Sequence, residues 1–251
     1  RLPNIGNGVR NLVFMAGHKF GAADNASLTW MMNVGVPMMV AETFRNMRIV
    51  AFSTACVYPF VPVDGPGADE RVPATPPSGD YANSCVGRER MFEYGSRAYG
   101  TPGRMVRLSY AIDMRYGVLF DLAKNIMSGT PINLEIGYFN CIWQGDVNEY
   151  AIRSLLHTSN PPCILNVTGP ESISIRWAAQ TMGELLGREP IFTGDPNPQK
   201  ALFSNTTKLT SMMGYPTMPL YKMMTMVADW VGSGGKFINA PTHFESTDGN
   251  Y

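Results

Sequence analysis

One tyrosine of this sequence stands where a proton-transfer residue could work. Tyr81 follows Asp80 at the predicted start of a helix, and the fourth residue after it is Cys85. A tyrosine with a lysine four residues later is a known acid/base pair, because the two share a helical face and the positive charge lowers the high pKa of the phenol. A cysteine supplies no such charge. The stretch therefore indicates an active site, a modified active site or a relic of one.

Three apolar stretches are predicted to be parallel strands that bring polar residues to one edge of a sheet. They span residues 11–15, 48–53 and 104–110. Helices are expected over 25–44 and 81–99, the second capped by Asp80. This alternation is typical of an α/β protein with a parallel sheet and helices on both faces, in which ligands bind at the carboxyl ends of the strands. The segments that follow those ends are 16–19, 53–56 and 108–110.

The second half of the chain continues the same alternation and is expected to form a small lobe partly outside the sheet. Helices are predicted over 116–128, 146–157, 174–186 and 219–231. Short strands are predicted over 132–136 and 163–167. Asp146 is expected to cap the helix that it begins. A polar tail follows the last helix.

The composition favours a protein that acts on small molecules. Lys plus Arg and Asp plus Glu number 20 each and are scattered, so neither nucleic acid nor a membrane is the expected partner. No apolar run reaches the roughly 18–20 residues that span a bilayer, and no signal pattern is present. The cysteines lie far apart, which argues against disulfides and a metal site. We expect a soluble, cytoplasmic protein in which Arg88, Glu89 and Arg90 lie on a solvated face.

Several motifs, in a fixed order, resemble one enzyme family. The family is the NAD-dependent epimerase/dehydratase family of extended short-chain dehydrogenases, and the similar segments span roughly residues 11–231. They are "VFMAG", Asn33, "AFSTACVYP" (51–59), a Pro-rich loop, "YANSC" from Tyr81, "RLSYAIDMRYG" (107–117) and "IWQGDVNEYAIRSLL" (142–156). The resemblance implies a Rossmann-type fold, NAD as cofactor with NADP as the alternative, and a homodimer.

The resemblance also implies roles for single residues. Thr54 is implied to hydrogen-bond the reacting oxygen of the substrate, and Tyr81 to exchange a proton with it while a hydride moves to or from nicotinamide. Cys56 occupies the place of a cysteine that moves a proton at a sugar carbon in related epimerases. Lys19, in the segment "AGHKFGA", resembles a lysine in the corresponding loop of some members of the same family. The residues implied to contact the cofactor are Ala16, Gly17, His18, Asn33, Ser53, Tyr81, Cys85, Leu108 and Tyr110.

Cys85 replaces the lysine that, in this family, holds the nicotinamide ribose and lowers the tyrosine pKa. Three explanations stay open. Cys85 is an ordinary packed residue of a protein that lost catalysis, Lys19 supplies the positive charge instead, or the charge of nicotinamide suffices alone. A large gain of activity in a Cys85→Lys variant would indicate a weakened enzyme, and no change would indicate a different chemistry or none.

Two further departures concern the cofactor and the substrate. The family begins with a strand and a Gly-rich turn that binds the cofactor pyrophosphate, whereas the segment with Gly6 and Gly8 lacks a preceding apolar strand and is predicted to be a loop. The first strand–helix units are therefore expected to be missing. Asn140 replaces an arginine that grips a phosphate or ribose, which favours a smaller polyol, sugar acid or lactone.

Together the motifs predict an NAD(P)-dependent oxidoreductase or epimerase that acts on a hydroxyl of a sugar, sugar acid or related polyol. The alternative is a non-catalytic cofactor-binding or regulatory protein of the same fold, which Cys85 favours. A dehydratase is disfavoured because Ala55 stands where an assisting carboxylic acid is needed. A partial dinucleotide-binding domain is predicted over 1–115 with about 142–168. A substrate-binding lobe and tail are predicted over 116–141 and 169–251.

Overall fold

The computed structural model of the protein describes residues 8–238 and 240–249, so that Gly6 lies outside the described residues. Four strands form a parallel sheet in the order β1-β2-β4-β9. They are β1 Asn11–Phe14, β2 Arg48–Thr54, β4 Gly103–Leu108 and β9 Cys163–Val167. The predicted parallel sheet is confirmed, and its strands lie within two residues of the predicted positions.

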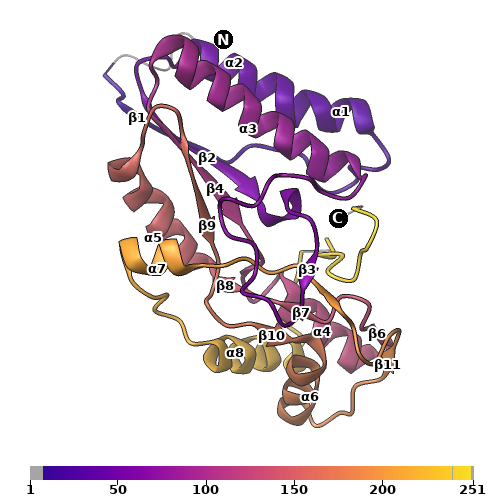
Figure 1. Cartoon of the computed structure of the whole chain (residues 1–251). Coiled ribbons are helices and arrows are strands. Elements are labelled where there is room, and N and C mark those ends of the chain that lie inside the picture. Colours follow the sequence, from indigo (N-terminus) through magenta and orange to yellow (C-terminus); the bar gives the residue numbers. More distant parts are fainter. Residues whose placement is uncertain (1–7, 239, 250–251) are drawn as a thin grey trace.

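Helices cover both faces of the sheet (Figure 1). Successive side chains of β2 point to opposite faces, so Ile49 and Ala51 pack against α2 (Val36–Thr43) and α3 (Asp80–Tyr99). On the other face, α5 (Gln144–Ser154) and α7 (Thr207–Met213) complete a second cluster. The buried members of that cluster are Val50, Phe52, Val106, Ile142, Val147, Tyr150, Ala151, Leu165, Val167, Leu209 and Met213. Both faces of this sheet are therefore apolar, which explains its uninterrupted apolar strands.

A third apolar cluster lies below the sheet in Figure 1 and forms a small lobe of helices and short strands. Its helices are α4 Val118–Ser128, α6 Ile175–Leu186 and α8 Leu220–Gly232. Two-residue strands pair around them, namely β3 Val61–Pro62 with β12 Lys200–Ala201, β5 Ala111–Ile112 with β8 Ile142–Trp143, β6 Ile132–Asn133 with β11 Phe192–Thr193, and β7 Tyr138–Phe139 with β10 Ile173–Ser174. The division into a dinucleotide-binding domain and a substrate-binding lobe, with its residue ranges, stays a prediction. None of the described helices is long and apolar enough to cross a lipid bilayer.

The first helical stretch is interrupted at its centre. Asn25 caps α1 (Ala26–Trp30), and a π-helical turn over Met31–Gly35 separates this helix from α2. The extra residue of a π turn changes which side chains face inward, and such turns are frequent at functional sites. Here the turn directs Asn33 into the protein, where it is fully buried.

Both aspartates predicted to cap helices do something else. The residue before α3 is Gly79, and Asp80 accepts a hydrogen bond of 2.7 Å from the indole of Trp30. Helix α5 (Gln144–Ser154) begins two residues before Asp146, whose carboxylate accepts hydrogen bonds from Thr217 and the backbone N–H of Met218. The predictions were wrong because a cap bonds locally, whereas these carboxylates join segments far apart in the chain. Helix α7 (Thr207–Met213) is an additional element that was not predicted from the sequence.

Candidate active site

Two adjacent cavities lie at the carboxyl ends of β1, β2 and β4. We call the first, of about 170 Å³, the threonine cavity, because Thr54, Cys56, Tyr110, Tyr116 and Thr242 line it. The second, of about 310 Å³, is the arginine cavity, with Gly17, His18, Phe52, Arg88 and Gln144 in its wall. The residues that border both cavities are Lys19, Ser53, Tyr81, Leu108 and Ala111. Tyr81 is thus in a position to contact two ligands at once.

Tyr81 lies half-buried in the first turn of α3. Burial raises the pKa of its phenol well above the ordinary value, and the Cys85 and Cys56 thiols act in the same direction. The positive charge of Arg88 and a hydrogen bond with Thr54 oppose this shift. The phenol is therefore protonated at neutral pH and ready to donate, whereas its action as a base requires more positive charge nearby.

Thr54 ends β2 and begins the short 3₁₀ turn that carries Cys56. Its hydroxyl accepts a hydrogen bond of 3.2 Å from the backbone N–H of Cys56 and so caps this turn. Cys56 is buried, and burial raises its pKa while Lys19 and Thr54 lower it. The thiol is consequently neutral at pH 7 and can act as a proton donor.

Lys19 reaches the threonine cavity from the loop after β1. Its Nζ donates to the hydroxyl of Tyr116 at 3.4 Å and to the carbonyl of Thr242 at 3.5 Å. The same nitrogen lies 5.9 Å from the centre of the Tyr81 ring. All four predicted catalytic residues, Thr54, Cys56, Tyr81 and Lys19, therefore line one cavity.

The segment after α8 contributes Thr242 to the wall of the threonine cavity and was not foreseen as part of the site. Thr242 donates from its backbone N–H and its hydroxyl to Asp121 of α4, at 2.8 and 2.6 Å. Gly249 lies against Gly79, just before α3. Figure 1 shows the tail in yellow beside the start of α3. No sequence signal links Thr242 to Lys19, because only the folded chain brings them together.

The prediction that Arg88, Glu89 and Arg90 share a solvated face is wrong for the first two. Arg90 is exposed, whereas Arg88 and Glu89 are only 6% and 7% exposed. Helix α3 packs between the sheet and α2, so an inward stripe at three- and four-residue steps is buried. That stripe comprises Ala82, Ser84, Cys85, Arg88, Glu89, Phe92, Gly95 and Ser96. Glu89 is tolerated because Ser53 and Arg107 of the strands satisfy its carboxylate, and Arg88 donates to the carbonyl of Phe52 and to Asn33.

Glu89 connects α3 to two strands of the sheet beside the site. Its carboxylate makes a two-point ion pair with Arg107 of β4, at 2.9 and 2.7 Å. The hydroxyl of Ser53 donates to the same carboxylate at 2.6 Å. Because Ser53 borders both cavities, this buried pair holds the end of β2 in place.

Tyr110 adopts a backbone conformation that few residues other than glycine occupy. Its φ is +30°, two residues after the end of β4, and its ring stacks edge-on against Phe139 with 5.9 Å between ring centres. Such a conformation costs roughly 1–3 kcal/mol and is concentrated at functional sites. The turn places Tyr110 in the wall of the threonine cavity.

The predicted cofactor residues fall into three groups, which are those that line a cavity, those that are fully buried and one that is exposed. Gly17, His18, Ser53, Tyr81 and Leu108 line the arginine cavity, and Tyr110 lines the threonine cavity. Asn33 and Cys85 are fully buried, and burial raises the pKa of the Cys85 thiol to about 12. Ala16 is exposed and lines neither cavity.

The position of the arginine cavity is suited to a dinucleotide cofactor. It lies at the carboxyl ends of the strands, where such cofactors bind, and a Cβ at Gly17 would collide with the guanidinium of Arg88. The Nε of Arg88 is buried without a hydrogen-bond partner, which leaves one donor of this residue of the cavity wall unsatisfied. Among the described residues, no group of three or more His, Cys, Asp or Glu side chains is arranged to hold a metal ion.

The parallel sheet, its two helical layers and the polar residues at the strand ends define a Rossmann-type α/β protein of the extended short-chain dehydrogenase class. Residues 7–157, more than half of the chain, match the family model described as the NAD dependent epimerase/dehydratase family. The chain therefore belongs to this family, and the resemblance inferred from its motifs is confirmed. A sequence search among curated proteins finds no match.

Solved structures share the fold at low sequence identity. UDP-glucose 4-epimerase of Thermus thermophilus, in complex with NAD, is 20% identical with a TM-score of 0.71, over 88% of this chain and 77% of that chain. UDP-glucuronic acid 4-epimerase of Bacillus cereus, in complex with NAD, is 16% identical with a TM-score of 0.78, over 94% and 78%. RMD of Pseudomonas aeruginosa, complexed with NADPH, is 14% identical with a TM-score of 0.74, over 89% and 82%.

Proposed function

We propose that this protein is an NAD(P)-dependent oxidoreductase or epimerase that acts on a hydroxyl of a sugar, sugar acid or related polyol. The observation that carries the proposal is the position of Tyr81, which borders two cavities and hydrogen-bonds Thr54. Alcohol oxidation needs a proton acceptor beside the reacting oxygen, and Tyr81 lines both the cavity assigned to the substrate and the cavity assigned to the cofactor. Membership of the family and the sugar epimerases among its solved relatives support the same conclusion.

Each residue of the site has a defined task in this proposal. Thr54 orients the reacting hydroxyl of the substrate in the threonine cavity, and Tyr81 takes up or returns its proton. NAD or NADP, when bound, supplies the acceptor or donor of a hydride, and Gly17 and Ser53 are in the wall that would hold it. Cys56, with Lys19 nearby, is the proton-transfer residue for inversion at a neighbouring carbon.

The surroundings of Asn140 favour a sugar acid, lactone or small polyol over a nucleotide sugar. Asn140 is buried, and its side-chain N–H groups donate to the carbonyls of Gly169 and Ser204. Its amide oxygen accepts from the N–H of Ser204 at 3.3 Å. A residue engaged in this way offers no cation to a diphosphate.

Calorimetric titration of NAD and of NADP into the protein tests the proposal. Saturable binding is expected, followed by reduction of the bound nucleotide with at least one member of a panel of sugar acids, polyols and nucleotide sugars. Binding without turnover across the panel favours the non-catalytic alternative. Absence of binding to either nucleotide contradicts the proposed function.

Thr54→Val is expected to lower turnover by roughly 10- to 100-fold, because it removes one polar contact to the reacting oxygen and keeps the size of the side chain. Steady-state kinetics with the substrate found in the panel measures the effect. Thr54→Ser keeps the hydroxyl and serves as the matched control, with an expected loss below about fivefold. Equal losses in the two variants would show that the hydroxyl of Thr54 is not used.

We also propose that two copies of the chain pair through α1, α2 and α3. Large apolar side chains are exposed on the first two helices and the turn between them, namely Leu28, Trp30, Met31, Met38 and Met39. Such an apolar patch is typical of a subunit interface. Sedimentation velocity is expected to show a dimer that Met38→Lys dissociates. Ile152→Lys changes an exposed apolar residue of α5 and should leave the dimer intact, whereas a monomeric wild-type protein contradicts the proposal.

A further inference from the structure

The replacement of the family lysine by Cys85 leaves a position that another residue of α3 can fill. Arg88 lies three residues after Cys85 and therefore on the same helical face. We infer that Arg88 takes over from the lysine, with its guanidinium binding the ribose next to nicotinamide and its positive charge acting on Tyr81. This inference rests on the proposed function and concerns the cofactor side of the same site.

The guanidinium of Arg88 is held in the wall of the arginine cavity by two acceptors. Its Nη1 donates to the carbonyl of Phe52 at 2.9 Å, and its Nη2 donates to the side-chain oxygen of Asn33. Asn33 is fixed in turn, since it donates to the carbonyl of His18 and to the hydroxyl of Ser84, both at 2.9 Å. The arginine is thus positioned by β2, by the loop after β1 and by the π turn before α2.

Arg88 is a buried cation that has no carboxylate partner among the described residues. The neighbouring Glu89 is paired with Arg107 instead, and the Nε of Arg88 has no hydrogen-bond partner. A buried charge is costly unless oxygen ligands compensate it, and its two bonds use only two of its five N–H groups. A ribose offers two adjacent hydroxyl oxygens, and the planar fork of a guanidinium matches such a pair of acceptors. The unused donors therefore indicate a ligand rather than a structural ion pair.

Gly17, which lies directly beside Arg88 in the wall of the same cavity, supports the same assignment. Any side chain at this position would collide with the guanidinium of Arg88. The glycine therefore leaves the space that the arginine needs to remain beside the cavity.

Lys19 is a second cation among the described residues of the site; it borders both cavities, but its hydrogen bonds lie in the threonine cavity. Its Nζ is bonded to Tyr116 and Thr242 in the threonine cavity. Its charge lowers the pKa of Cys56, whereas that of Arg88 lowers the pKa of Tyr81 and of Cys85. We therefore assign Arg88 to the cofactor side of the site and Lys19 to the substrate side.

Calorimetry with ADP and with ADP-ribose tests this inference on the full chain, because the two ligands differ by the ribose that Arg88 would bind. Arg88→Met is expected to weaken ADP-ribose binding by roughly 10- to 100-fold and ADP binding by less than about threefold, because charged hydrogen bonds to the ribose are lost. Arg88→Lys should restore part of the affinity. Adding Cys85→Lys to Arg88→Met should also restore part of it, since the lysine then stands at the family position.

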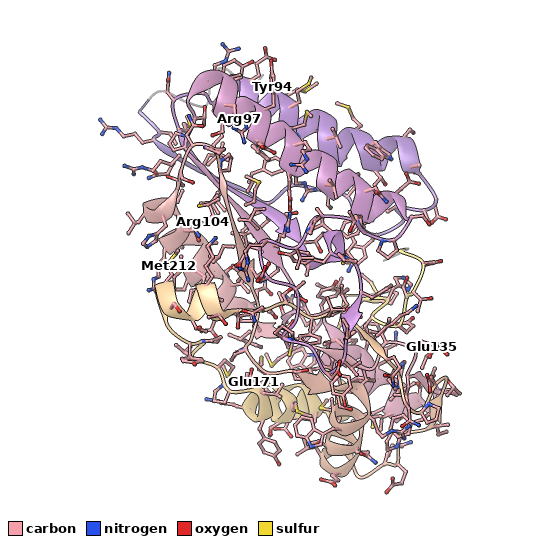
Figure 2. All side chains as sticks on the ribbon, in the orientation of Figure 1. Tyr94, Arg97, Arg104, Glu135, Glu171 and Met212 are labelled. Atoms are coloured by element: carbon pink, nitrogen blue, oxygen red, sulfur yellow. The ribbon has the colours of Figure 1, made fainter. Side chains whose placement is uncertain are left out.

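Arg104→Met is the matched control for loss of a buried arginine. Arg104, labelled in Figure 2, is 3% exposed, donates to the carbonyl of His157 and lines neither cavity. This variant should keep the wild-type preference for ADP-ribose. Unchanged affinity, or equal weakening of both ligands, in Arg88→Met overturns the inference.

Two further outcomes are distinguishable. A wild-type protein that binds neither ligand contradicts the proposed function itself. If Arg88→Met does not fold, Gly17→Ala provides the same test, because the added methyl group displaces the guanidinium. A selective loss of ADP-ribose binding in Gly17→Ala supports the inference, and an unchanged preference overturns it.

Discussion

Tyr81→Phe is expected to reduce turnover by at least about 100-fold while nicotinamide nucleotide affinity changes by less than about threefold. The substitution removes the hydroxyl that exchanges the substrate proton and keeps the ring that borders both cavities. The loss should therefore appear in kcat. Steady-state kinetics and calorimetric titration of the nucleotide measure the two quantities separately.

Tyr58→Phe is the matched control for Tyr81→Phe. Tyr58 is a buried tyrosine near the same strand end, and its hydroxyl donates to Asn166 at 2.8 Å. Its loss should lower the free energy of unfolding by about 1–2 kcal/mol and leave kcat within about threefold. If Tyr81→Phe retains wild-type kcat, Tyr81 is not the acid/base and the proposed mechanism is wrong.

The second large effect is expected for stability. Glu89→Gln should lower the free energy of unfolding by about 3–5 kcal/mol, because it leaves the charge of Arg107 buried without a counter-charge. The end of β2 would also lose a charged acceptor for Ser53. Urea denaturation followed by circular dichroism measures the change.

Glu93→Gln on the same helix is the control for this loss. Glu93 also pairs with arginines, Arg90 and Arg97, but all three side chains are partly or largely exposed, and Figure 2 shows Arg97 near the outer end of α3. Its expected cost is below about 1 kcal/mol, because water screens and replaces such pairs. Similar losses for Glu89→Gln and Glu93→Gln would contradict the structural role of the buried pair.

The sequence alone was sufficient to predict the sheet, the long helix α3 and the residues at the strand ends. Apolar stretches of strand length and helical periodicity are local properties, so β1, β2, β4 and β9 were found within two residues of their bounds. Parallel strands bring their carboxyl ends to one edge, which is why Lys19, Thr54 and Cys56 were expected together, and the resemblance to the family added Tyr81 at the start of a helix. The structure places all four around one cavity.

Only the tertiary structure decided how the charged and polar residues are used. Arg88 and Glu89 are charged residues on a helix, and their burial depends on acceptors and donors supplied by Asn33, Phe52 and Arg107 from other elements. The same holds for the tail residue Thr242, which reaches Lys19 across 223 positions of the chain. Local sequence carries no record of such long-range partners, because whether a buried charge is tolerated depends on the groups that surround it in three dimensions.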